Sequence, residues 1–171
     1  IQGAGELVFE ARIKFATLTT DLYDLFIGLI ESVALAAAVP CTSTQGLIAD
    51  NNMVGFYRDS TDATTSALLD TTYKADTVAV VNVKEGAITL VADTWVKVGM
   101  IFNRRGDNRL EFTRNGIILP DSKVIPSTQT DFPSDTRLGW AFASLITAAN
   151  ASDFASIDWV RVAQRRVSVP L

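Results

Sequence analysis

The sequence contains no histidine and a single cysteine, Cys41, among its 171 residues. Without histidine there can be no Ser-His-Asp triad, no Cys-His pair and no imidazole ligand for a metal ion. One cysteine cannot form an internal disulfide, and a thiol without a histidine partner is a poor nucleophile. We therefore interpret Cys41 as a buried or loop thiol, and we expect no catalytic residue, no metal site and no cofactor.

Positive charge and long apolar runs are also scarce. The chain carries 15 Lys and Arg against 19 Asp and Glu, for a formal net charge of -4, which argues against a nucleic-acid partner. No apolar run reaches the roughly 18 residues that a membrane span needs. The alanine-rich stretch 33–39, a candidate for one short helix, ends at Pro40. Because the chain opens at Ile1 in the middle of a pattern, we expect preceding residues, including any targeting segment, to be missing.

What the sequence does contain is a set of clear strand patterns, centred on residues 92–116. Apolar side chains alternate with other residues from 95 to 102, a polar turn follows at 103–108, and the alternation then resumes. Asn115-Gly116 is the pair best able to adopt the positive φ angles of a type I′ turn, which leads into a third strand at 117–119. This stretch predicts an antiparallel meander.

Further strands are indicated on both sides of the meander. Residues 7–15 have one apolar face and, except for Val8, one polar face, whereas residues 25–30 are apolar on both faces, as expected for a strand inside a sandwich. The other predicted strands cover residues 53–58, 67–69, 76–83, 87–91, 137–144 and 157–163. About a dozen short strands without helical units between them predict an all-β fold, an antiparallel β-sandwich formed as one domain over residues 1–171.

Three segments together resemble the concanavalin A-like jelly roll of lectins, glucanases and laminin G-like modules. They are ELVFEARI at 6–13, TWVKVGM at 94–100 followed by LEFTRNG at 110–116, and IDWVRV at 157–162. In such domains a Trp opens a strand, a hairpin and an Asn-Gly turn follow, and the last strand pairs near the first. The resemblance covers the whole chain and implies a jelly-roll sandwich, but a fold alone does not confer a function.

The glucanase branch of this superfamily carries Glu-x-Asp-x-x-Glu or Glu-x-Asp-x-Glu on one strand, because a retaining mechanism needs two carboxyl groups about 5 Å apart. The sequence has no such cluster, and its nearest approach, Asp21 and Asp24, lies in a predicted loop. We therefore expect that the protein is not an enzyme.

In composition the chain resembles structural proteins of tailed phages. It is 48% hydrophobic, and its stretches 25–30 and 78–83 are apolar on both faces, so we expect protein contacts to cover them. This interpretation makes the chain a non-enzymatic virion protein, most simply a bacteriophage capsid decoration (cement) protein. Its partners would be capsid or other virion proteins and further copies of itself, and it would reside in the virion after assembly in the host cytoplasm.

The alternative is a glycan-binding, lectin-like adhesion module of a tail fibre or cell surface. Its ligand residues would be Trp95 and Trp159, if these rings and the loop aspartates converge on one surface. Trp140 shares a face with Leu138 and Phe142 and is expected in the core.

Three further patterns have simpler explanations than function. Asp59 with Asp62, or Asp131 with Asp135, offers oxygen ligands that suit Ca²⁺, Arg105-Gly106-Asp107 spells an adhesion tripeptide, and Asn150-Ala151-Ser152 matches a glycosylation acceptor. Aspartate and glycine are also what turns and hairpin tips require. We therefore expect these residues to form loops.

Overall fold

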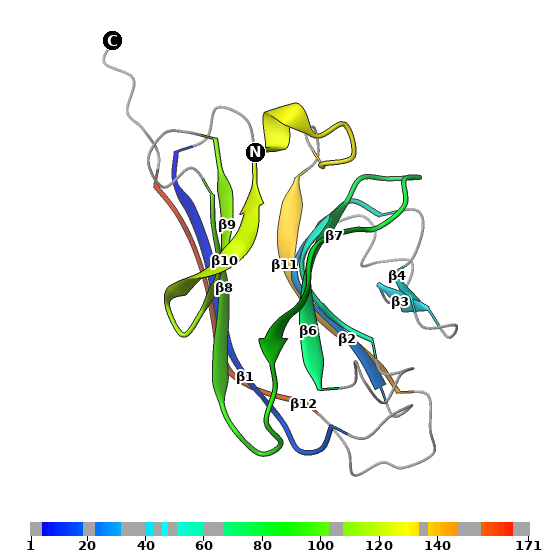
Figure 1. The fold of residues 1–171 in the computed structure, drawn as a ribbon, viewed down its shortest axis with the longest axis vertical. Coiled ribbons are helices and arrows are strands. Elements are labelled where there is room, and N and C mark those ends of the chain that lie inside the picture. Colours follow the sequence, from blue (N-terminus) through cyan, green and yellow to red (C-terminus); the bar gives the residue numbers. More distant parts are fainter. Residues whose placement is uncertain are drawn as a thin grey trace.

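The computed structural model describes residues 5–18, 23–31, 40–42, 46–47, 51–59, 67–102, 108–133, 137–146 and 155–165. Two five-stranded antiparallel sheets lie face to face (Figure 1). Sheet A runs in the order β10 (Ile117–Val124), β9 (Leu110–Arg114), β8 (Val96–Phe102), β1 (Leu7–Phe15) and β12 (Ala155–Gln164). Sheet B runs β11 (Leu138–Ile146), β2 (Tyr23–Glu31), β5 (Met53–Arg58), β6 (Leu68–Lys74) and β7 (Val81–Thr89). The predicted antiparallel sandwich is confirmed.

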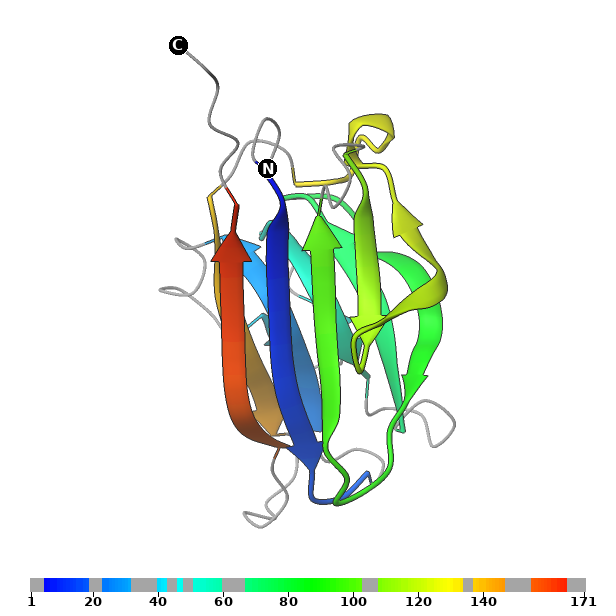
Figure 2. The same ribbon diagram turned by 90° about the vertical axis from the view of Figure 1, so that its left-hand side faces the viewer.

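In sheet A, β1 pairs with the central strand β8 on one side and with the edge strand β12 on the other (Figure 2). Its side chains alternate as predicted, with Phe9, Ala11, Ile13 and Phe15 fully buried. The last strand therefore lies beside the first, as the resemblance to the jelly roll implied.

The predicted meander is also confirmed. Strands β8, β9 and β10 are neighbours in sheet A, and Asn115 and Gly116 have φ angles of 52° and 82° between β9 and β10. The Asn115 side-chain oxygen accepts a hydrogen bond from the backbone N–H of Lys97 at 2.9 Å. The turn chemistry read from the sequence thus fixes the register of this edge.

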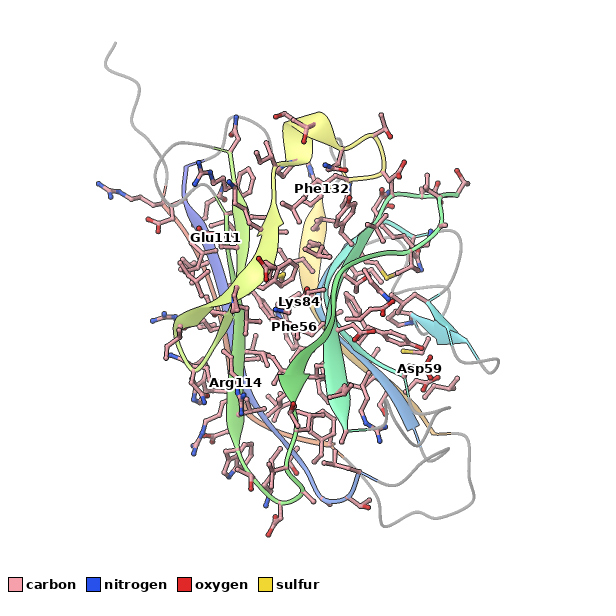
Figure 3. All side chains as sticks on the ribbon, in the orientation of Figure 1. Phe56, Asp59, Lys84, Glu111, Arg114 and Phe132 are labelled. Carbon is pink, nitrogen blue, oxygen red and sulfur yellow. The ribbon has the colours of Figure 1, made fainter. Side chains whose placement is uncertain are left out.

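One apolar cluster fills the space between the sheets. Phe56 of β5 meets Phe112 of β9 edge to face, with ring centroids 5.4 Å apart and planes at 84°, and Phe56 lies between the sheets in Figure 3. Both side chains are completely buried. Burying an aromatic side chain of this kind contributes about 1.5–3 kcal/mol, so this pair is one of the direct links that hold the two sheets together.

The face of sheet B that points away from sheet A, called here its outer face, is covered in part by a small two-stranded sheet. Strands β3 (Cys41–Thr42) and β4 (Gly46–Leu47) lie on this side in Figure 1. A second apolar cluster forms beneath them from Phe26, Ile30, Cys41, Leu47, Met53, Tyr57, Ala141 and Leu145. The chain itself therefore buries the second apolar face of residues 25–30, which the sequence assigned to a contact with another subunit.

The prediction for residues 67–91 was wrong in detail. The structure has two strands, β6 and β7, where the sequence indicated three, and residues 75–80 connect them with Thr77 at φ 60°. Gly86 falls between the predicted strands 76–83 and 87–91, where the chain would have to turn. In the structure it lies inside β7 at φ 57°, near shifts in the β6–β7 register. A glycine with positive φ forms a bulge as readily as a hairpin turn, and the sequence does not distinguish the two.

The prediction that Trp140 lies in the core was also wrong, since Trp140 is 55% exposed. Leu138 and Phe142 pack against the main cluster as expected. Trp140 is exposed although it shares their side of the strand, because β11 lies at the edge of sheet B and has no neighbour beyond it.

Some predictions fall on residues outside those described. These are the short helix at 33–39, the tripeptide at 105–107 and the acceptor at 150–152. In the part of the chain that the structure describes, no helix is long and apolar enough to cross a membrane.

Candidate functional site

The two predicted ligand residues, Trp95 and Trp159, lie on one face. Trp159 of β12 is the cross-strand partner of Arg12 on β1, and the Arg12 guanidinium carbon lies 5.0 Å from the centroid of the Trp95 ring. Trp159 is 37% exposed. The structure therefore brings both rings to the outer face of sheet A, on either side of Arg12. Asp59 is one of the loop aspartates that were expected to converge with these rings. It follows β5 in sheet B and so does not lie beside them.

A group of acidic side chains occurs on the opposite side of the molecule, at one end of the outer face of sheet B. Tyr57 of β5 pairs directly with Asp70 of β6. Asp59 comes two residues after Tyr57, and Asp24 comes two residues before Phe26, the partner of Tyr57 on β2. Side chains two residues apart on a strand share a face, and Figure 3 shows Asp59 on the side of sheet B away from sheet A. We call Asp24, Tyr57, Asp59 and Asp70 the acidic site.

The three aspartates act on the ionisation of Tyr57. Burial raises the pKa of its hydroxyl, and the negative charges of Asp24, Asp59 and Asp70 raise it further. The Tyr57 side chain is 7% exposed, and its hydroxyl has no hydrogen-bond partner among the described residues. A buried hydroxyl of this kind normally has a partner, which can be an enclosed water molecule.

Asp70 has the properties of a proton donor. Burial raises the pKa of its carboxyl group, and the neighbouring charges of Glu85 and Asp59 act in the same direction. The backbone N–H of Gly86 donates a 2.7 Å hydrogen bond to one carboxylate oxygen, which lowers the pKa and fixes the side chain. The bulge at Gly86 thus orients Asp70, and a carboxyl group with a raised pKa is suited to general acid catalysis near neutral pH.

The spacing of Asp59 and Asp70 follows from the strand register. Because Tyr57 is opposite Asp70, Asp59 is the diagonal neighbour of Asp70, and diagonal pairs have Cα atoms about 7–8 Å apart. Both residues are half-buried and reach the surface. Inverting glycosidases hold their two carboxyl groups about 6.5–9.5 Å apart, which leaves room for the attacking water, and a Cα spacing of this order is compatible with that range. The pair can therefore act as an acid and a base in hydrolysis.

This arrangement was not predicted, because only acidic residues on a single strand were considered as a catalytic cluster. Asp24 was dismissed as a loop residue and Asp59 was considered only as a calcium ligand, although Asp24 lies in β2. Asp62 and Asp135, the other halves of the suggested calcium pairs, lie outside the described residues. Within the described segments, no group of three His, Cys, Asp or Glu side chains is arranged to hold a metal ion.

Cys41 borders the acidic site as a buried thiol, as predicted. Its side chain is 4% exposed. Burial, and then the charge of Asp24, raise its pKa to about 12. Because the thiolate is the reactive form, Cys41 is a poor nucleophile.

A separate groove of about 380 Å³ lies beside β7 and β10. Its described lining is Tyr73, Val81, Val83, Lys123, Val124, Ile125, Thr128 and Gln129. The Tyr73 hydroxyl donates to the Gln129 side-chain oxygen at 3.3 Å. No Asp or Glu is among these residues, so the groove offers no acid and base pair.

Comparison with solved structures shows what this sandwich is similar to. A β-1,3-glucanase from Mycobacterium marinum aligns with 94% of this chain and 64% of its own, at 15% identity and a TM-score of 0.55. A glycoside hydrolase family protein from Mycobacterium thermorestibile gives the same coverage at 14% identity and a TM-score of 0.55. A family 16 glycosyl hydrolase from Mycobacterium smegmatis gives 15% identity and a TM-score of 0.54. No family model and no curated protein sequence matches the chain.

These neighbours contradict the functional prediction. All three are named as glucanases or glycoside hydrolases, and none is named as a virion protein. The statement that the protein is not an enzyme is contradicted by the same finding. The capsid partners and the virion location were expected only because of that function, and no finding tests them directly.

The fold prediction, in contrast, is confirmed. The chain spans slightly less than two thirds of each neighbour, 64% of its length, and at this identity the likeness establishes the architecture alone. The protein has the concanavalin A-like jelly-roll fold.

Proposed function

We propose that this protein hydrolyses glycosidic bonds in a polysaccharide at the acidic site. The observation that carries the proposal is the placement of Asp70, a carboxyl group with a raised pKa, diagonal to Asp59 on the next strand. Tyr57 pairs directly with Asp70 across the strands and comes two residues before Asp59. Glycoside hydrolysis requires two such carboxyl groups, one protonated and one ionised.

In the proposed reaction, Asp70 donates its proton to the glycosidic oxygen as the bond from that oxygen to the anomeric carbon breaks. Asp59 removes a proton from the water that attacks the anomeric carbon, so that one carboxyl group loses the proton that the other gains. The Gly86 N–H holds Asp70 in position throughout.

The first substrate to test is β-1,3-glucan, because one structural neighbour is named a β-1,3-glucanase. The purified protein is incubated with β-1,3-glucan, β-1,4-glucan, xylan and mannan, and soluble products are identified by mass spectrometry. Release of short oligosaccharides from at least one polymer is the expected result. If no polymer yields products across pH 4 to 8, the proposal is wrong.

A further inference from the structure

We propose that the outer face of sheet A is a second polysaccharide-binding surface, one that holds an uncharged chain. It is formed by Trp95, Arg12 and Trp159, which we call the tryptophan face. This proposal rests on the proposed function for its class of ligand. It adds a binding surface on the side of the sandwich opposite the acidic site (Figures 1 and 2).

The tryptophan face is built by three neighbouring strands. Strand β1 lies between β8 and β12, and Figure 2 looks onto this side of the sheet. Trp95 directly precedes β8 and Trp159 lies on β12, so their backbones are two strand spacings, roughly 9–10 Å, apart across the sheet. Along the strands they are offset, because Trp159 is level with Arg12 whereas Trp95 comes one residue before Val96, the partner of Ile13. An extended sugar chain that crosses the strands would contact both rings.

The Trp95 ring is held in place before any ligand binds. The Arg12 guanidinium carbon lies 5.0 Å from the centroid of Trp95, and the Lys14 ammonium nitrogen lies 5.5 Å from it. The Arg12 guanidinium is fixed in turn by a 2.7 Å ion pair with Asp158. A surface that is ordered in advance loses little conformational entropy on binding.

The charges of this face explain why the ligand should be uncharged. Each cation of the face is paired with a carboxylate of the same face: Arg12 with Asp158, Lys14 with Asp93, and both Lys97 and Arg161 with Glu10. An anionic ligand would have to compete with these carboxylates for the cations. A neutral sugar chain can hydrogen-bond to the fixed ion pairs and stack on the rings without breaking them.

The test measures binding separately from hydrolysis. Asp70→Asn protein is mixed with insoluble β-1,3-glucan and the bound fraction is measured, with polygalacturonate-coated beads as the anionic polymer. We expect Trp159→Ala and Trp95→Ala, each added to Asp70→Asn, to reduce binding at least tenfold, and Trp159→Phe to retain much of it. Trp140→Ala is the matched control, because Trp140 is more exposed but lies on sheet B.

Each outcome decides the proposal. Binding that is lost in the Trp159 and Trp95 variants, kept in the Trp140 variant and kept at 0.5 M salt supports it. Equal binding by all variants, stronger binding to polygalacturonate, or no binding overturns it. Hydrolysis of a soluble β-1,3-linked hexasaccharide by the corresponding variants with Asp70 intact is followed in parallel. Normal hydrolysis without glucan binding would overturn the binding role of the tryptophan face, while the proposed function would still hold.

Discussion

Gly28 of β2 and Gly55 of β5 face each other at the centre of sheet B with no space for a side chain on either. A Cβ atom on Gly28 would lie 2.6 Å from the Gly55 Cα and 2.3 Å from the Val54 carbonyl oxygen. Gly28 lies in the predicted strand 25–30 and Gly55 in the predicted strand 53–58. This contact brings β2 and β5 together beside Tyr57, and so it helps to place Asp24 within the acidic site.

We predict that Gly28→Ala and Gly55→Ala each destabilise the protein by about 1–3 kcal/mol, the usual cost of forcing an extra methyl group into a packed site. Urea unfolding followed by tryptophan fluorescence gives the free energy of unfolding. Gly139→Ala is the matched control, since a Cβ there meets nothing within 4 Å, and its effect should stay within about 0.5 kcal/mol. Equal effects at Gly28 and Gly139 would contradict the close approach.

Cys41 should resist alkylation in the folded protein. Its pKa is raised to about 12 by burial and by Asp24, so almost no thiolate is present at pH 8 and little of the side chain is accessible. We expect iodoacetamide to label the native protein at least a hundredfold more slowly than the protein in 8 M urea. Labelling at similar rates in the two conditions would show that β3 and β4 do not cover this face.

The raised pKa of Asp70 predicts a specific dependence of stability on pH. Below the ordinary carboxyl pKa of 3.8 the group is protonated in both the folded and the unfolded chain. As the pH rises towards the folded-state pKa, the unfolded chain ionises more readily, so the contribution of Asp70 to stability is lost across that window. Asp70→Asn removes this titration and keeps an acceptor for the Gly86 N–H. Its stability relative to wild type should therefore increase from pH 3.8 upwards and then level off.

Urea midpoints at a series of pH values measure this difference. Asp76→Asn is the matched control, because Asp76 is exposed near the end of β6. The Asp76 comparison should show no such rise. A difference between Asp70→Asn and wild type that stays constant, or that falls with pH, would mean that Asp70 is not desolvated.

Local patterns predicted much of the sandwich. Strand β1 and the meander β8 to β10 were found because each has one buried face and one wet face, and Asn115-Gly116 carries its turn type in its residues. The prediction that Trp140 lies in the core was wrong, because the pattern shows which side of a strand a residue occupies but not whether the strand lies at an edge. The strand boundary predicted at Gly86 was wrong, because a glycine with positive φ occurs in turns and in bulges alike.

The acidic site was not predictable from the same patterns. Asp24, Asp59 and Asp70 lie on or beside three strands, and they meet only through the pairing of β2 with β5 and of β5 with β6. Spacing along the sequence reveals carboxyl groups that share a strand, whereas this group depends on register between strands. Trp95 and Trp159 were identified as exposed aromatic candidates, but their approach to Arg12 likewise required the order β8, β1, β12.

The most direct test of the central claim is the initial rate of β-1,3-linked hexasaccharide hydrolysis by Asp70→Asn relative to wild type, with Asp76→Asn as the control. If Asp70 donates the proton to the leaving oxygen, the rate at pH 6 falls by about 10²–10⁴-fold, while the Asp76 variant keeps its rate and both variants remain folded. An Asp70→Asn protein that hydrolyses the hexasaccharide as fast as wild type would contradict the assignment of the acidic site.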